Sequence, residues 1–266
     1  MKRRRSGGFV WCALFITVVL CRTIAAAEPV VVSTIRLQTP QGRITAEVFE
    51  ESAAQKRPAV LVLHGAGGTL LDGPAMRRTA RALAADGNAV YLLHYFQRTG
   101  TIVALDSTMQ RHFGDWVETV RDSIKAVQEA RGDATPVGIY GYSLGAFLAL
   151  RVASDNPRVG AVVEHAGGVF NETYERIGRV PPVLMVHGQR DGRVPFARYA
   201  QPLIPVLRRR AAKLETRFFP EEGHGFSPAA MAELQTDAAR FFRRHLQRAA
   251  SEAAATSTTA RTGRLR

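Results

Sequence analysis

One short segment, GYSLG at residues 141–145, constrains the fold of this chain more than any other. The apolar run Val137–Tyr140 leads directly into it, and the Ala/Leu-rich run Leu144–Ala153 leads directly out. The first run predicts a buried strand and the second predicts a helix, with a sharp turn between them. Glycines flanking such a turn let the strand and the helix approach closely. The segment therefore predicts that Ser143 is presented at the tip of a sheet, at a helix N-terminus.

Strand and helix patterns alternate over residues 28–248. Continuous apolar runs predict buried strands, and apolar residues spaced three and four apart predict helices. The predicted strands are Val30–Leu37, Arg43–Phe49, Ala59–His64, Ala89–Leu93, Val137–Tyr140, Val159–Glu164, Val183–Val186 and Leu214–Phe219. The predicted helices are Pro74–Asp86, Ser107–Arg131, Leu144–Ala153, Phe196–Arg209 and Ala229–Leu246. After an antiparallel opening hairpin, this order predicts an α/β fold with a mostly parallel central sheet, covered on both faces as a three-layer sandwich.

Two further loops carry polar side chains at strand ends. HGQRDGRVP (187–195) holds Asp191, and EEGHGF (221–226) holds His224. Taken alone, an Asp-Gly pair is typical of a plain turn, and a lone histidine between glycines is typical of a surface loop. However, Ser143, Asp191 and His224 follow the order nucleophile, acid, base, and each lies after a strand. Because the carboxyl ends of parallel strands share one edge, the three residues predict a catalytic triad.

A glycine-rich loop, HGAGG at residues 64–68, follows the predicted strand Ala59–His64. It lacks the G-K-[ST] ending of a phosphate-binding loop and the G-x-G-x-x-G pattern, which argues against a nucleotide. Its position instead predicts one N–H donor for an oxyanion, from Ala66 or alternatively from Gly67. The second donor is the N–H of Leu144, the residue after the predicted nucleophile.

With these motifs the chain resembles the dienelactone hydrolase family of the α/β-hydrolase fold. The elbow, the HG loop and the order of the three polar residues resemble the α/β-hydrolase fold in general. The resemblance to the family covers roughly residues 45–248 and is carried by HGQRDGRVP, EEGHGF, the compact length and the lack of a cap insertion. It implies an α/β-hydrolase fold without a large cap domain, and a carboxylic ester or lactone as the small-molecule substrate. Dienelactone hydrolases proper carry a cysteine nucleophile in this elbow, whereas this chain carries Ser143.

The residue types predict a mechanism that needs neither a cofactor nor a metal. A serine hydroxyl is a weak nucleophile, so it needs an adjacent base. His224 would take the Ser143 proton and later return it to the leaving alcohol. Asp191 would fix the imidazole tautomer and stabilise the imidazolium. An acyl-enzyme would form, and water would release the acid.

Four side chains are candidates for the walls of a substrate pocket. His94 and Tyr95 follow a strand at the same edge of the sheet, Tyr142 lies inside the elbow, and His165 follows another strand. His64, by contrast, is predicted to be a structural residue of the glycine-rich turn. Glu164 could also reach the site, but no spacing demands it.

The N-terminus predicts a secretory signal peptide over residues 1–27. Met1–Arg5 is basic, Phe9–Cys21 is an uncharged run of 13 residues, and Ala25–Ala27 supplies the small residues of a cleavage site. A membrane span needs about 20 apolar residues, so an uncleaved anchor is the weaker interpretation. We therefore expect a bacterial protein exported to the periplasm or the medium, with no stable membrane span. The hydrolase domain then covers 28–248, and 249–266 is predicted to be a disordered basic tail.

The formal net charge of +13 is not evidence for nucleic-acid binding. Part of the charge lies in the predicted signal peptide and tail, and the cluster 208–210 lacks interleaved aromatic residues. Two alternative functions stay open: a serine peptidase of the prolyl-oligopeptidase type, and a non-catalytic binding protein on a hydrolase scaffold. The sequence carries no signal of oligomeric state.

Overall fold

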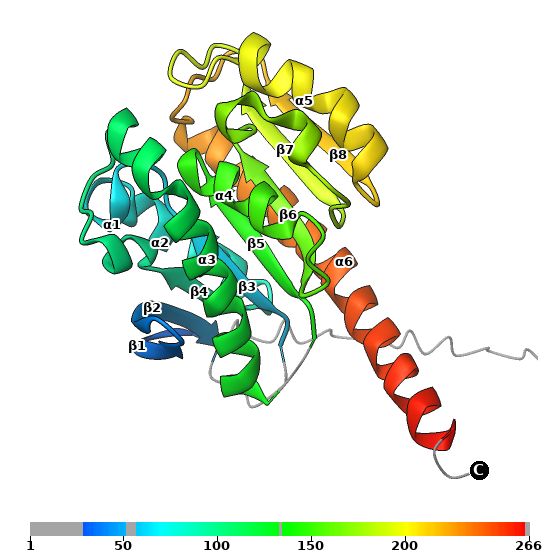
Figure 1. Ribbon diagram of the computed structural model, residues 1–266. Coiled ribbons are helices and arrows are strands. Elements are labelled where there is room, and N and C mark those ends of the chain that lie inside the picture. Colours follow the sequence, from blue (N-terminus) through cyan, green and yellow to red (C-terminus); the bar gives the residue numbers. More distant parts are fainter. Residues whose placement is uncertain (1–28, 52–56, 133–134, 264–266) are drawn as a thin grey trace, which may run out of the picture.

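The computed structural model describes residues 29–51, 57–132 and 135–263 (Figure 1). The predicted signal peptide lies outside these residues. The strands form one eight-stranded sheet in the order β1-β2-β4-β3-β5-β6-β7-β8. They are β1 (Val30–Thr39), β2 (Gly42–Glu51), β3 (Ala59–Leu63), β4 (Ala89–Leu93), β5 (Val137–Tyr142), β6 (Val159–His165), β7 (Val183–Gly188) and β8 (Leu214–Phe219).

The directions of the strands confirm the predicted mostly parallel sheet. β1 and β2 form the expected antiparallel hairpin, and β2 also pairs antiparallel with β4. Every later pairing, from β4–β3 to β7–β8, is parallel. The parallel strands β3, β5, β6 and β7 are almost entirely buried, which explains their continuous apolar sequences.

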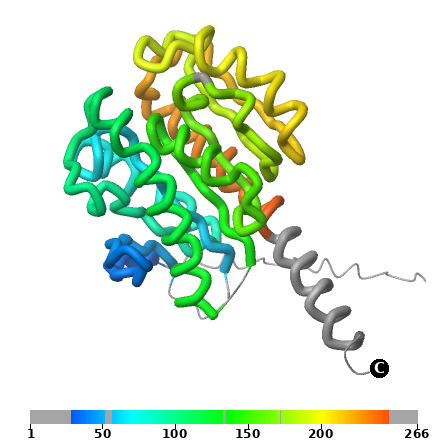
Figure 2. The backbone as a smooth tube through the Cα atoms, viewed as in Figure 1, coloured from blue at the N-terminus to red at the C-terminus, as the bar shows by residue number. Residues whose placement is uncertain are grey.

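Helices cover both faces of the sheet, which confirms the three-layer prediction. Buried residues of α3, α4 and α5 share one apolar core, and those of α2 and α6 share the other. Figures 1 and 2 show α3 and α4 in front of the strands and α6 crossing behind them. The helices are α1 (Gly68–Leu71), α2 (Gly73–Ala85), α3 (Asp106–Arg131), α4 (Leu144–Ala153), α5 (Phe196–Arg210) and α6 (Pro228–Gly263). Three short 3-10 helices add Tyr95–Thr99, Phe170–Glu172 and Tyr174–Arg176.

The long helix α3 shows why the spacing of apolar residues in the sequence predicted a helix. Its apolar residues Trp116, Val120, Ile124 and Val127, spaced three and four apart, are all fully buried. Each such side chain contributes roughly 1.5–3 kcal/mol by leaving water. Phe113 is only partly buried and stacks on Phe170, with ring centroids 4.0 Å apart.

The last helix corrects the prediction for the C-terminus. α6 continues to Gly263, so residues 249–263 are helical rather than a disordered tail. Alanine has the highest helix propensity, and five alanines within residues 249–255 extend the helix beyond its apolar stripe. None of the helices within the described residues is long and apolar enough to cross a membrane.

Candidate active site

Ser143 occupies a strained turn between β5 and α4. Its backbone angles are φ 54° and ψ −123°, a conformation that L-residues rarely adopt. A Cβ on Gly145 would lie 2.3 Å from the carbonyl oxygen of Leu63, and one on Gly141 would lie 2.3 Å from the carbonyl oxygen of Gly145. Only glycine fits at both positions, so the motif GYSLG is a steric requirement of this turn.

The structure brings the three predicted triad residues together. His224 Nε2 lies 2.9 Å from Ser143 Oγ, and His224 Nδ1 lies 2.8 Å from Asp191 Oδ2. The carboxylate accepts the Nδ1 hydrogen, so Nε2 is left to accept the serine hydroxyl hydrogen. The Asp191 side chain is fully buried, whereas the His224 side chain is 22% exposed. This arrangement can deprotonate the serine and then protonate a leaving group from the solvent side.

Asp191 is held as an anion by its own loop. Its Oδ1 accepts the backbone N–H groups of Arg193 and Val194, both at 2.8 Å. Burial raises the pKa of Asp191, but the hydrogen bonds from His224 and from these N–H groups outweigh it, and the pKa lies below its ordinary value. His187 packs beside this carboxylate, and burial lowers its pKa, which favours a neutral ring.

The glycine-rich loop lies next to the elbow, and its hydrogen bonds distinguish between Ala66 and Gly67 as the oxyanion donor. Ala66 and Leu144 line the same cavity as Ser143. Leu144 is the first residue of α4, where backbone N–H groups have no partner within the helix. The N–H of Gly67 instead donates to Asp72 Oδ2 at 3.0 Å, so this alternative is already engaged. The geometry favours Ala66 as the second donor.

Asp72 is a site residue that the sequence reasoning missed. The run Asp-Gly-Pro at residues 72–74 is typical of a helix N-cap, and Asp72 does occupy that position of α2. Its carboxylate makes no capping bond and turns back to Gly67. Burial raises the pKa of Asp72, and the Gly67 hydrogen bond opposes this only in part. The acidic residue thus fixes the conformation of the glycine-rich loop.

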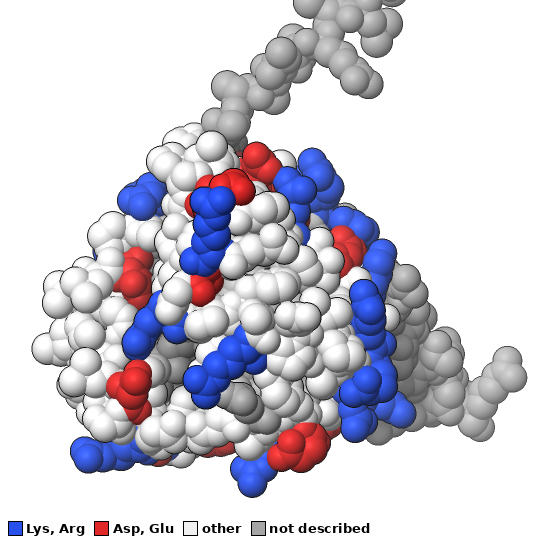
Figure 3. Space-filling view, turned by 90° about the horizontal axis from the view of Figure 1, so that it is seen from above, with Lys and Arg blue, Asp and Glu red and all other residues white. Residues whose placement is uncertain are grey.

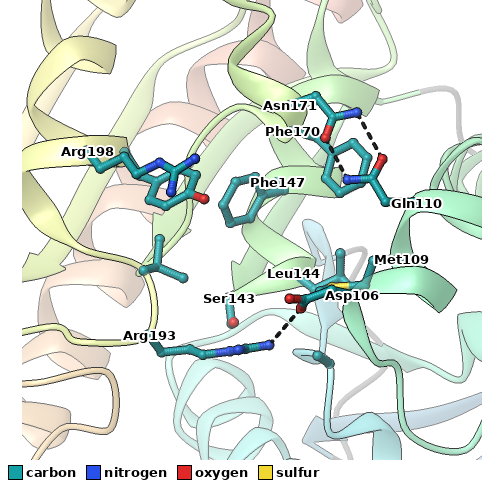
Figure 4. A pocket seen from close by; sticks show the side chains of 13 residues that line it. Asp106, Met109, Gln110, Ser143, Leu144, Phe147, Phe170, Asn171, Arg193 and Arg198 are labelled. Carbon is teal, nitrogen blue, oxygen red and sulfur yellow. Dashed lines mark hydrogen bonds and ion pairs between the residues drawn. The ribbon is translucent and has the colours of Figure 1, made fainter.

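A cavity of about 290 Å³ opens at Ser143 (Figure 4). Aromatic and aliphatic side chains form much of its wall, and a bridge from Arg193 to Asp106 (3.2 Å) crosses one side. Residues from several separate segments line it: Ala66, Asp106, Met109, Gln110, Ser143, Leu144, Phe147, Phe170, Asn171, Arg193, Val194, Arg198 and Tyr199. Most of them carry no motif, so no sequence signal could have singled them out.

The face that contains this cavity is shown from above in Figure 3. Basic side chains gather along the right side of the view, whereas basic and acidic side chains are interspersed among uncharged ones in its left and central parts. Five large apolar side chains are exposed near the glycine-rich loop: Leu70, Leu71, Ile102, Val103 and Leu105. The approach to the site therefore combines exposed apolar side chains with the charged side chains Asp106, Arg193 and Arg198.

Two of the four predicted pocket residues lie elsewhere. His94 Nε2 lies 2.9 Å from Glu47 Oε1, and Tyr95 is wholly buried, with its hydroxyl donating to the carbonyl of His64 at 2.8 Å. Neither lines the cavity at Ser143. His64 stacks on Tyr95 with ring centroids 4.2 Å apart, and burial lowers its pKa to about 4, which fits the structural role predicted for it.

The other two predicted pocket residues, Tyr142 and His165, line a second cavity of about 450 Å³. Glu164 lies on the opposite face of β6 and is fully buried, close to Gly167 and Ala146. Neither of its carboxyl oxygens has a hydrogen-bond partner among the described residues, and burial raises its pKa to about 8. In the part of the chain that the structure describes, no cluster of three or more His, Cys, Asp or Glu side chains could hold a metal ion.

The sheet order, the strained elbow and the Ser-His-Asp contacts together define an α/β-hydrolase fold. Solved structures agree with this class. A dienelactone hydrolase from Anabaena variabilis matches with a TM-score of 0.60 at 18% identity, covering 82% of this chain and 99% of that one. A promiscuous dienelactone hydrolase-like phosphotriesterase from metagenomic libraries matches with a TM-score of 0.68 at 20% identity, covering 80% and 98%. The acylaminoacyl peptidase of Pyrococcus horikoshii matches with a TM-score of 0.65 at 13% identity, covering 82% of this chain and 42% of that one.

Within this class, the family model described as the dienelactone hydrolase family matches residues 44–259. The chain therefore belongs to the dienelactone hydrolase family, as its motifs predicted, and is a hydrolase. A comparison with curated protein sequences found no match.

Proposed function

We propose that this chain is an exported serine hydrolase that cleaves carboxylic esters, or a lactone, through an acyl-enzyme formed on Ser143. One observation carries the proposal: the continuous contact from Ser143 Oγ through the His224 ring to a buried Asp191 carboxylate, at 2.9 and 2.8 Å. Such a relay activates a hydroxyl that is otherwise a weak nucleophile.

The proposed reaction has two halves. Ser143 Oγ attacks the ester carbonyl carbon while its proton moves to His224 Nε2, and the N–H groups of Leu144 and Ala66 stabilise the oxyanion. The carbon–oxygen bond to the alcohol then breaks, and His224 returns the proton to the leaving oxygen. Water repeats the sequence on the acyl-enzyme and releases the acid, with the free serine restored.

A peptidase activity is the second candidate, and the likeness to the Pyrococcus horikoshii acylaminoacyl peptidase is the observation that favours it. A p-nitrophenyl ester and a p-nitroanilide with the same acyl group separate the two functions. An esterase turns over the ester and leaves the anilide intact, whereas a peptidase cleaves both.

The direct test is hydrolysis of p-nitrophenyl acetate, butyrate and octanoate by the purified protein and by Ser143→Ala. We expect the substitution to abolish turnover, since removal of a triad serine costs about 10⁶ in kcat. Ser33→Ala, at an exposed position of β1, is the matched control and should keep full activity. Labelling by a fluorophosphonate addresses the remaining alternative: a wild-type protein that neither reacts nor hydrolyses any ester would be a binding protein on this scaffold.

Export is tested separately, by expressing the full chain in a bacterium. N-terminal sequencing of the protein recovered from the periplasm or the medium should give a chain that begins at Glu28. Recovery of uncleaved chain in the membrane fraction would contradict the proposed signal peptide.

A further inference from the structure

The second cavity, of about 450 Å³, adjoins the proposed active site but is lined by different residues. Its walls come from α1, α2, α6, the end of β6, the elbow and the segment that follows His224. Its lining residues include Leu71, Asp72, Tyr142, His165, Phe226 and Met231. The mechanism above assigns it no role.

Contacts around Gly65 show how near this cavity comes to the nucleophile. A Cβ built on Gly65 would lie 2.7 Å from Asp72 Oδ2, 3.3 Å from the Tyr142 ring and 3.1 Å from Ser143 Cβ. Asp72 and Tyr142 are walls of the second cavity, so two of these walls border the same glycine as the side chain of Ser143. The Tyr142 hydroxyl also donates to the carbonyl of His224 at 3.3 Å.

One buried polar atom in the wall of this cavity lacks a partner. His165 is 1% exposed, and its Nδ1 pairs with the Tyr140 hydroxyl at 2.9 Å. Its other ring nitrogen, Nε2, is buried and has no hydrogen-bond partner among the described residues. Phe226 and Tyr142 pack against the ring, with centroids 4.6 and 5.0 Å away. Leaving a buried polar atom unpaired is unfavourable, and a hydrogen bond from a ligand would remove that cost.

The direction of proton transfer decides which part of an ester lies here. The leaving alcohol takes its proton from His224, so the alcohol part must lie beside the segment that carries this residue. Gly225 and Phe226 of that segment line the second cavity, whereas no residue of 221–226 lines the cavity at Ser143. The acyl part is left to the cavity at Ser143, next to Leu144 and Ala66.

We propose that the second cavity binds the alcohol part of the ester, an apolar alkyl chain with a hydroxyl group that hydrogen-bonds to His165 Nε2. The apolar side chains Leu71, Met76, Phe226 and Met231 contact the chain. A hydroxyl both donates and accepts, so it pairs with either tautomer of the neutral imidazole. This inference rests on the proposed ester hydrolysis and names the class of leaving group.

The experiment compares butyrate esters that form the same acyl-enzyme: ethyl, hexyl and 6-hydroxyhexyl butyrate. For the wild type, kcat/KM should rise at least tenfold from ethyl to hexyl and about a further tenfold with the hydroxyl. Met231→Trp narrows the second cavity and should lower the hexyl-to-ethyl ratio at least tenfold. Met109→Trp, the matched control, narrows the cavity at Ser143 and should instead change the ratio between ethyl octanoate and ethyl acetate.

His165→Phe keeps an aromatic ring in the wall and removes the polar atom, so the hydroxyhexyl-to-hexyl ratio should fall about tenfold. Thermal melting of each variant verifies that it folds. The proposal is overturned if Met231→Trp changes the acyl-chain ratio rather than the alcohol ratio, or if it changes neither. A wild type that hydrolyses no ester would instead refute the proposed function itself, so the two failures are distinguishable.

Discussion

Replacement of Asp191 by asparagine tests the relay where its geometry is most constrained. Oδ1 accepts two backbone N–H groups at 2.8 Å, and Oδ2 accepts His224 Nδ1–H at 2.8 Å. The amide oxygen of the variant will occupy the first position, since an NH₂ group there would face two donors. The amide NH₂ then faces Nδ1 of His224. That nitrogen must become the acceptor, and Nε2 must carry the hydrogen toward Ser143 Oγ.

The variant therefore folds with the wrong imidazole tautomer, and the serine has no base. In serine protease triads the equivalent substitution lowers kcat about 10⁴-fold. At 1.36 kcal/mol per factor of ten, this corresponds to about 5.5 kcal/mol of transition-state stabilisation. We expect a loss of this size for Asp191→Asn, with little change in folding, because the two backbone hydrogen bonds to Oδ1 persist.

The assay is the kcat for p-nitrophenyl butyrate, measured with the melting temperature of the same preparation. Asp115→Asn, at a half-exposed position of α3, makes the same chemical change away from the site and should leave kcat intact. A kcat for Asp191→Asn within tenfold of the wild type, at unchanged melting temperature, would refute the assignment of Asp191 as the residue that orients His224.

Three further substitutions have defined outcomes. Gly145→Ala drives a methyl group against a backbone carbonyl and should cost at least about 1–3 kcal/mol in urea unfolding, whereas Gly192→Ala, with open space, should be neutral. The pKa of Glu164 is about 8 in the folded chain and 4.5 ordinarily. The free energy of unfolding should therefore fall by about 1.4 kcal/mol for each unit that the pH rises between these two values. A series of melting curves over this pH range should show that fall in the wild type and not in Glu164→Gln. Asp72→Ala frees the Gly67 N–H and should lower kcat roughly tenfold in the ester assay, and an unchanged kcat would exclude a positioning role.

Much of the candidate site could be predicted because its chemistry depends on local geometry. The elbow needs glycine at 141 and 145, since a Cβ at either would strike backbone atoms. Ser143, His224 and Asp191 lie in hydrogen-bond contact, as their order along the chain predicted. The reason is that the loops after parallel strands all lie at one edge of the sheet. The end of the last helix was predicted wrongly. The apolar pattern of α6 stops near its predicted end, but the helix continues to Gly263 because the following residues have high helix propensity.

The hydrogen-bond partners of individual side chains could not be predicted in this way, as His94 and Asp72 illustrate. His94 ends a strand at the correct edge, yet it pairs with Glu47, a residue 47 positions earlier on a neighbouring strand. Asp72 has the sequence of a helix cap, yet its carboxylate bonds to the loop before it. Both outcomes depend on which partner is nearest in three dimensions, which spacing along the chain does not encode.

The sequence by itself determined the layered α/β architecture, the strained serine turn and the identity of the three relay residues. Each follows from hydrophobic periodicity or from steric limits within a few residues. Only the tertiary structure decided that Gly67 is engaged by Asp72, that Ser143 opens into a cavity, and that His165 lines a second cavity with its Nε2 buried and unpaired among the described residues. Cavities are formed by side chains from segments far apart in the chain, so their walls exist only once the strands and helices have packed.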